Sequence, residues 1–335
     1  MLTVWKIFSF VSVGSLCAPV LGGVLYNQAG YPGVFGIGFA VIAIDFTMRA
    51  LVIEKKVARR YESQDSSQGD DPASAPSHQQ NHGPDEEEGN SEQQPLIGSN
   101  KEDAAAFKLS ENQPRIARMI PILPCLGDPR LLTAFLLAFI QATLLGNFDA
   151  TIPTVAQELF HFDSLQAGVL FLPLGIFDLL LGPVFGWCVD RFGTKPVAVL
   201  SYTYLIPVLT LLRLPHEGEH DQIILYGGLL ALCGIGLACI GAPSIVEAGA
   251  IVQKYYEVNP EFFGDNGPYA QLYGLNSMVF SAGLTLGPEL AGELKRVIGY
   301  GNMNAVLAAV CAVTAGLSFV YIGGKPRLFP RRRKG

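Results

Sequence analysis

The chain has 335 residues, of which 50% are hydrophobic and only 16% are charged, and its mean hydropathy is +0.33. This composition is too apolar for an ordinary soluble domain, so an integral membrane protein is the first expectation. The formal net charge of -6 does not indicate an acidic protein, because most acidic residues crowd into one polar stretch between residues 61 and 111. We therefore expect the protein to lie in a lipid bilayer and to bind no nucleic acid.

Apolar stretches follow one another along the chain, and each approaches the roughly 20 residues that a helix needs to cross a bilayer. Their ranges are 5–25, 33–53, 131–154, 166–188, 195–213, 223–247, 271–292 and 302–322. Lipid offers no water to open backbone groups, and the alternating strands of a membrane barrel are absent. We therefore predict an all-α integral membrane bundle of about eight transmembrane helices, with two in residues 1–54 and six in residues 131–323.

The polar stretch between the second and third apolar stretches is rich in Ser, Gln, Asp, Glu, Gly and Pro. Such a composition predicts a disordered linker, which we place at residues 55–130. Within it Glu92, Leu96 and Ile97 fit an acidic dileucine pattern, which a sorting adaptor binds through the acid and the aliphatic pair. A chance match in an acidic linker is the alternative interpretation.

The distribution of basic residues predicts the orientation of the helices. If the eight stretches alternate across the membrane, all but three of the 23 Lys and Arg fall on the side of the linker. The exceptions are Arg213, Lys295 and Arg296. Because Lys and Arg are enriched in cytoplasmic loops, we expect the linker and the basic tail at residues 324–335 to be cytoplasmic.

A ten-residue pattern, G-x-x-x-(G/A)-P-x-x-(G/A)-G, occurs at residues 14–23 and again at residues 283–292. Its positions are Gly14, Ala18, Pro19, Gly22 and Gly23 in the first copy and Gly283, Gly287, Pro288 and Gly292 in the second. Small residues at this spacing let helix backbones approach closely in lipid, and the proline permits a bend. One copy can arise by chance among 37 glycines, but two copies in equivalent places indicate internal duplication, which is typical of transporters.

A third pattern, G-x-x-x-D-R-x-G-x-K, lies in the short loop after the fourth stretch. Its residues are Gly186, Asp190, Arg191, Gly193 and Lys195. Together with the repeated pattern, it resembles the major facilitator superfamily. The repeat is similar to that family's antiporter motif of helices 5 and 11, and the loop is similar to its signature after helices 2 and 8.

The resemblance implies a gating role for this loop. Asp190 and Arg191 would pair with a neighbouring helix end, Gly193 would permit the tight turn, and Lys195 would anchor the next helix at the lipid phosphates. The alternative is that Arg191 and Lys195 only obey the positive-inside rule, which leaves Asp190 and the glycine spacing unexplained.

The resemblance also implies that the eight stretches correspond to helices 5 to 12 of the usual twelve. Residues 146–175 resemble vesicular amine and multidrug proton antiporters, with fungal members closest. The first four helices of the family have no counterpart here, so we expect the chain to lack them. A truncated remnant, or a structural membrane protein that transports nothing, is the alternative.

Carboxylates inside apolar stretches are candidates for a proton or substrate path. Asp178 falls near the middle of its stretch, and Asp149 lies before Pro153, where the resembling amine transporters also have an acidic residue. Asp149 would bind a cationic substrate or a proton, or would simply face interfacial water. Glu247 is a third coupling candidate, with an interfacial role or a bond to free backbone as its alternatives.

A further carboxylate, Asp45, precedes Arg49 by four residues, so we expect a structural ion pair there.

The expected function is therefore secondary transport, in which a proton gradient drives efflux of a small cationic or amphipathic organic molecule by antiport. No nucleotide-binding loop, metalloprotease motif or serine nucleophile motif occurs, so we expect no enzyme activity, no metal and no cofactor. The expected location is the plasma membrane or a vacuolar or vesicular membrane.

Overall fold

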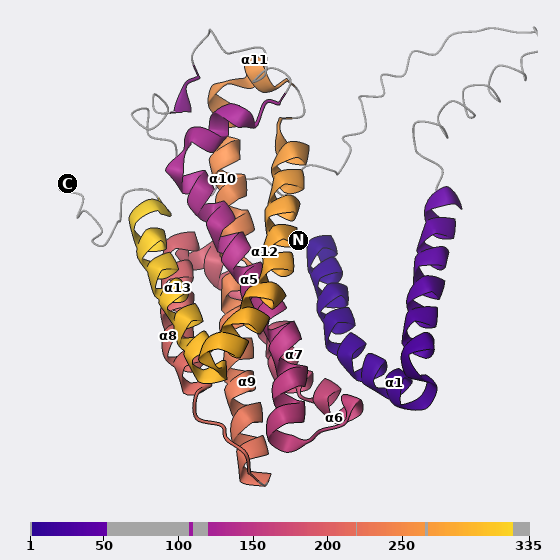
Figure 1. Cartoon of the computed structure of the whole chain (residues 1–335). Helices are drawn as coiled ribbons and strands as arrows, with labels where there is room; N and C mark the ends of the chain where they lie inside the picture. The colour runs from indigo at the N-terminus through magenta and orange to yellow at the C-terminus, as the bar shows by residue number, and fades with distance from the viewer. Residues whose placement is uncertain (1, 52–106, 110–119, 219, 265–266, 324–335) are drawn as a thin grey trace, which may run out of the picture. The chain divides into compact units, whose positions relative to one another are not determined.

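The computed structural model describes residues 2–51, 107–109, 120–218, 220–264 and 267–323, and these residues are all-α (Figure 1). The chain divides into two compact units. One unit combines residues 1–27 with residues 99–335, and the other comprises residues 28–98. The predicted fold class is thus confirmed for the described residues.

Helix α1, Leu2–Leu51, contains both of the apolar stretches that we expected before the linker. Its backbone leaves the helical conformation at Gly30, which has φ 62° and ψ -163°. A positive φ favours glycine, and Pro32 lies in the first turn after the break, where proline is tolerated, so the break lies where the sequence permits it. This break lies near the division between the two units, at residues 27 and 28.

The larger unit continues as a bundle that contains the remaining apolar stretches. Its helices are α5 Pro129–Phe160, α6 Ser164–Val169, α7 Phe171–Phe192, α8 Thr194–Leu211, α9 His220–Gly241, α10 Pro243–Val258, α11 Pro260–Phe263, α12 Tyr269–Ile298 and α13 Tyr300–Tyr321. The main packing pairs are α5 with α12, α7 with α9, and α8 with α13. The N-terminus of α5 and the C-termini of α10 and α13 lie at one end of the bundle, which we call the linker end. We call the other end of the bundle the opposite end.

Fewer helices than expected meet the requirements of a membrane span by length and composition. Among the described residues there are five: Cys17–Leu51, Pro129–Phe160, Ser164–Phe192, His220–Val258 and Tyr300–Tyr321. The expected count of about eight is higher because it separated the two stretches of α1 and also included α8 and α12. Helix α8 begins with Thr194, Lys195 and Pro196 and contains further polar residues, and α12 ends in a polar segment that contains Glu289, Glu293, Lys295 and Arg296.

Helix boundaries in the bundle follow from local chemistry. The side chain of Asp128 accepts a hydrogen bond from the backbone N of Arg130 at 2.9 Å, and Pro129 follows it, so α5 begins with an N-cap and a first-turn proline. Gly193 and Gly299 have φ of 90° and 80°, and each connects two helices in a single residue.

The structure differs from the expected linker at its C-terminal part. A short 3₁₀ helix, η2, spans Leu123–Gly127, and Phe107, Ile122 and Cys125 are buried against the ends of α5, α10 and α12. Large apolar side chains are frequent in this part of the sequence, and Leu109 and Leu126 pack against the same cluster. The boundary of the folded bundle therefore lies before residue 130, while residues 52–106 and 110–119 are outside the described part of the chain.

Candidate functional site

The contact between α5 and α12 is formed by the second copy of the repeated pattern. A Cβ atom at Gly283 would lie 2.5 Å from the carbonyl oxygen of Phe139, and one at Gly287 would lie 2.5 Å from that of Thr143. From the other side, a Cβ at Gly146 would lie 2.8 Å from Cδ of Pro288. Distances this short exclude any side chain at these positions, so the two backbones touch directly.

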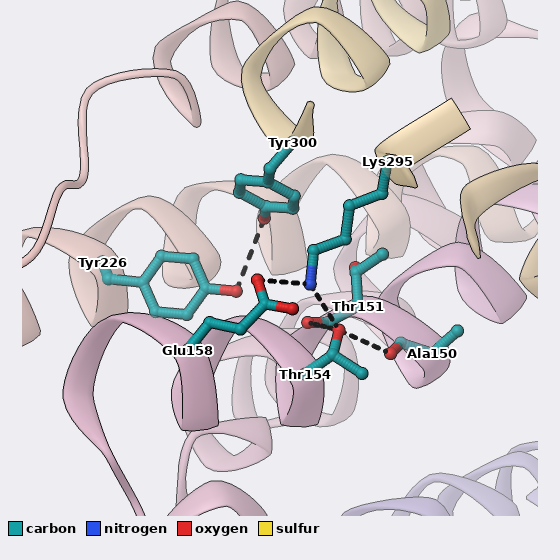
Figure 2. Close-up of polar contacts among 7 residues, drawn as sticks. All are labelled: Ala150, Thr151, Thr154, Glu158, Tyr226, Lys295 and Tyr300. Atoms are coloured by element: carbon teal, nitrogen blue, oxygen red, sulfur yellow. Dashed lines mark hydrogen bonds and ion pairs between the residues drawn. The ribbon is translucent and has the colours of Figure 1, made fainter. Parts of the chain in front are cut away.

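This row of small residues extends along α12 to a basic side chain at the opposite end of the bundle. Ala291 is buried one turn after Gly287, and Lys295 follows one turn later. Nζ of Lys295 lies 2.8 Å from Oε2 of Glu158 and donates a hydrogen bond to Oγ1 of Thr154 at 3.0 Å, as Figure 2 shows. Both partners belong to α5, so the same two helices are also joined by charge.

An open hollow of about 500 Å³ lies beside this ion pair. It is lined by Ala150, Thr151, Thr154, Glu158, Gly292, Lys295 and Arg296. Gly292 therefore faces this space and does not contribute to the close contact with α5, which is consistent with the open room around its Cα. The hydroxyls of Tyr226 and Tyr300, drawn in the same view, are 3.4 Å apart and link α9 to α13.

The coupling candidates Asp149 and Asp178 lie on different helices. Asp149 of α5 is exposed, although residues 146–148 and 151–152 on either side of it are buried. Asp178 of α7 is half-buried and interacts with other residues. Two positions before Asp149, the side-chain amide of Asn147 is buried and has no hydrogen-bond partner among the described residues.

The loop signature lies at the junction of α7 and α8, at the linker end. Gly193 takes φ 90° and its N–H donates to the carbonyl of Val189 at 2.8 Å, so it makes the turn that the pattern required. The guanidinium of Arg191 lies 5.6 Å from the ring centroid of Trp187, one turn earlier on α7. Lys195 has its Nζ 5.2 Å from the ring centroid of Phe319 on α13.

The expected pairing of Asp190 with a neighbouring helix end differs from the structure. Asp190 is exposed and has no hydrogen bond or ion pair to any residue that the structure describes. The contact between helices is made instead by Thr194, which is buried and donates its hydroxyl hydrogen to Oε2 of Glu247 on α10. Gly186 has open space around its Cα and makes no close helix contact.

Glu247 connects three helices. Besides the hydroxyl of Thr194, it accepts the backbone N–H of Gly323, just after α13, with its Oε1 at 3.0 Å. The side chain is buried, so the two hydrogen bonds satisfy a carboxylate that would otherwise be costly in this position. The backbone group that Glu247 accepts thus comes from the end of α13, and not from backbone that the neighbouring Pro243 leaves free.

The first copy of the pattern packs against α6. A Cβ at Gly23 would lie 2.6 Å from the carbonyl oxygen of Ser164, and one at Gly168 would lie 2.6 Å from that of Pro19. Gly14 and Gly22 have nothing within 4 Å of a Cβ position, and Ala18 is exposed. Only part of the first copy is therefore used in a close contact.

The remaining expected residues lie in the smaller unit or outside the described chain. Nε of Arg49 lies 2.8 Å from Oδ2 of Asp45, so the structure contains the expected ion pair. Both side chains are exposed. Glu92, Leu96 and Ile97 of the sorting pattern lie outside the described residues, as does the basic tail.

Sequence reasoning missed Thr194, Glu158 and the role of Lys295. Thr194 stands between Gly193 and Lys195 of the loop signature, so its position at the N-terminus of α8 was a usable signal. Lys295 continues the four-residue spacing of Gly283 and Gly287, and this spacing was a second usable signal. No local pattern points to Glu158, because its partner is 137 positions further along the sequence.

Comparison with known proteins shows the family. Residues 6–256 match the model of the Major Facilitator Superfamily. The chain is 43% identical over 330 residues to the MFS-type transporter ppzB of Metarhizium majus, a match that covers 96% of this chain and 71% of that protein. It is 31% identical to the uncharacterized MFS-type transporter C18.02 of Schizosaccharomyces pombe, over 92% of this chain and 64% of that protein.

A more distant similarity, 23% identity over 63% of this chain and 38% of the other protein, relates it to the synaptic vesicular amine transporter of Mus musculus. The family match and the two fungal relatives cover most of the chain, and its helices are long and apolar enough for an integral membrane protein. The chain belongs to the major facilitator superfamily of membrane transporters.

Proposed function

We propose that the protein exchanges protons for a small cationic or amphipathic organic molecule and moves that molecule out of the cytosol. The observation that carries this proposal is Asp149. Its carboxylate lies within the span Pro129–Phe160, is exposed, and has no hydrogen bond or ion pair to any described residue. Ionisable groups within spans are costly in lipid and commonly serve proton or substrate pathways.

One carboxylate can support exchange without further machinery. A proton neutralises Asp149, and an organic cation pairs with it only in its ionised form. Occupation by one therefore excludes the other, which is the requirement for antiport. The close contact of Gly283 and Gly287 with α5 holds the helix that carries Asp149 against α12 as one body during the motion.

Asp178 is the second candidate for coupling, since it is half-buried on α7. Glu247 is a weaker one, because both of its oxygens already accept hydrogen bonds from Thr194 and Gly323. We propose that Glu247 has a structural role at the linker end, where it joins α10 to α8 and to the end of α13 next to the loop signature.

The orientation follows from charge: the linker and the basic tail lie in the cytosol, and the membrane is the plasma membrane or that of a vacuole or vesicle. If Leu96 and Ile97 address the protein to an internal membrane through an adaptor, changing both to Ala will move a fluorescently tagged chain to the cell surface. An unchanged location in microscopy would assign the pattern to chance.

The transport proposal is tested in proteoliposomes with an acidic interior and ethidium, a fluorescent organic cation, outside. We expect the wild-type chain to accumulate the dye and a protonophore to abolish this accumulation. Asp149→Asn should reduce the rate of accumulation by more than about tenfold, because it removes the group that takes up and releases the proton. Asp163→Asn is the matched control. Asp163 is the N-cap of α6, directly before the span Ser164–Phe192, and its backbone N–H donates to Oε1 of Gln166. Asparagine is also a good N-cap residue, so the substitution removes a charge outside the spans and keeps the cap.

Uniform inactivity of the wild-type and both variants, with normal insertion and folding, over a panel of organic cations and amphipathic neutral compounds would favour the alternative of a structural membrane protein. Wild-type activity that Asp149→Asn leaves intact while Asp178→Asn removes it would transfer the coupling role to α7.

A further inference from the structure

Residues 107–109 lie on the linker end of the bundle and are held there by one side chain. The Nδ2 of Asn259, directly after α10, donates to the carbonyl oxygen of Phe107 at 2.8 Å. Its Oδ1 accepts the backbone N–H of Leu109 at 3.0 Å. The amide thus offers one donor and one acceptor to alternate residues of an extended segment, the same groups that a neighbouring β-strand would offer.

The aromatic ring of Phe107 supplies the apolar part of this contact. Phe107 is 6% exposed and meets the ring of Tyr255 edge to face, with centroids 5.0 Å apart and an interplanar angle of 87°. Nζ of Lys254 lies 5.8 Å from the centroid of the same ring. In contrast, the adjacent Lys108 is exposed. The surface on α10 therefore recognises one anchor side chain and the backbone that follows it.

Residues 120–127 also pack on the linker end of the bundle, where they contact two further helices. We call residues 107–109 and 120–127 together the linker-end cap. The backbone N of Ile122 donates to Oε1 of Gln271 on α12 at 3.1 Å. Cys125 is fully buried in a cluster that includes Phe135 of α5, Val252 of α10 and Leu272 of α12. One cap thus connects the linker ends of three helices that belong to different parts of the sequence.

Helix α10 has a structural reason to move separately from its neighbours. It is divided from α9 at Ala242 and Pro243, where the proline cannot donate to the preceding turn. Its linker end packs against α5 and α12 through Ile251, Val252 and Tyr255, and Tyr255 and Asn259 add contacts with residues 107–109. Because Pro243 weakens the junction with α9 and residues 107–109 hold the other end, opening of that contact would free the linker end of α10 to shift.

We propose that residues 107–109 are a strap which Asn259 and Tyr255 fasten to the linker end of α10, and that the strap is released each time this side of the transporter opens. The inference rests on the proposed transport function for its second half. Its first half, the docking of the strap, stands on the contacts alone.

Docking is tested by the reactivity of Cys125 in the full-length chain after Cys17, Cys188, Cys233, Cys239 and Cys311 have been changed to Ala. Burial, with a smaller effect of the Asp128 carboxylate, raises the pKa of the Cys125 thiol to about 12. The thiol should therefore react slowly with N-ethylmaleimide while the cap is closed. We expect Phe107→Ala and Asn259→Ala to speed the reaction by at least about tenfold, because each removes a buried contact of the strap.

Lys108→Ala is the matched control within the strap and should leave the rate unchanged. The unfolding midpoint of each variant, measured in parallel, separates local opening from loss of the fold. Equal reactivity of Cys125 in Phe107→Ala, Asn259→Ala and the parent chain would overturn the docking half of the inference.

Release is tested by a disulfide that replaces the ring contact. Phe107→Cys with Tyr255→Cys, in a chain without its natural cysteines, should transport ethidium after reduction and lose at least about tenfold of that rate after oxidation, because a locked strap then prevents α10 from moving. Equal rates in the oxidised and reduced forms would overturn the release half. A wild-type chain that inserts but transports nothing would contradict the proposed function and the release half together, whereas the reactivity of Cys125 would still decide the docking half.

Discussion

The two copies of the glycine and proline pattern use different faces of the helix. In the copy at residues 283–292 the first and fifth positions, Gly283 and Gly287, touch the backbone of α5, while the tenth, Gly292, is open. In the copy at residues 14–23 the tenth position, Gly23, touches the backbone of α6, while the first, Gly14, is open. The pattern therefore provides two adjacent rows of small residues, and the neighbouring helix decides which row is used.

The largest effect should come from the row that contacts α5. In Gly287→Ala the new Cβ would lie 2.5 Å from the carbonyl oxygen of Thr143, and backbone cannot give way as a flexible side chain can. We expect a loss of stability at the upper end of the roughly 1–3 kcal/mol that overpacking costs, or more. The unfolding midpoint in detergent measures it, with Gly14→Ala as the matched control.

Gly14→Ala should be neutral or slightly stabilising, because nothing lies within 4 Å and Ala favours the helix. Equal losses in the two variants would contradict the assignment of different rows.

A smaller loss is expected from the partner glycine on α5. A Cβ at Gly146 would lie 2.8 Å from Cδ of Pro288 and 2.9 Å from the carbonyl oxygen of Leu284, so it meets α12 less closely than the contact at Gly287. Gly146→Ala should destabilise by about 1–2 kcal/mol. In the double variant with Gly287→Ala the losses should not add, since either change alone already separates the helices. Additive losses in the thermal midpoint would show that the two glycines belong to separate contacts.

The copy in α1 should respond at one position and not at its neighbour. Gly23→Ala places a Cβ 2.6 Å from the carbonyl oxygen of Ser164, whereas Gly22→Ala meets nothing within 4 Å. We expect Gly23→Ala to lose about 1 kcal/mol, less than Gly287→Ala, because α6 is short and can shift. Limited proteolysis between α1 and α5 would compare the two variants, and greater sensitivity of Gly22→Ala would reverse the assignment.

The smallest effect should come from the ion pair that ends the second row. Lys295 pairs with Glu158 at 2.8 Å, but the side chain of Glu158 is 61% exposed. Lys295→Met should therefore lose no more than about 1 kcal/mol, and the loss should shrink in high salt because exposed pairs are screened. A large loss that is independent of salt would show that the pair is buried by something beyond the described residues.

Much of the helical framework could be predicted from sequence, but most contacts between helices could not. Uninterrupted apolar stretches predict helices because lipid leaves the backbone few choices, and Gly193 and the pair Asp45 and Arg49 involve neighbours that are close in sequence. The hydrogen bonds of Glu247 could not be predicted, for the opposite reason. Its partners Thr194 and Gly323 are 53 and 76 residues away, and only the packing of α8, α10 and α13 brings them together.

The cap at the linker end was missed on similar grounds. Composition predicts disorder for the stretch taken as a whole, but its end is apolar, and there Phe107, Ile122 and Cys125 are buried on the bundle. The hydrogen bonds between Asn259 and residues 107–109 join positions that are about 150 residues apart in the sequence. A single apolar residue in a polar context gives no sign of such a distant partner.

The measurement that tests the account most directly is proton movement during exchange. Proteoliposomes that hold a trapped pH-sensitive dye, with equal pH on both sides, are given an inward gradient of an organic cation. We expect the interior to become alkaline as protons leave in exchange for the cation. Asp149→Asn should remove this signal, while Asp163→Asn should retain it. Uptake of the cation with no change of internal pH would contradict proton-coupled antiport.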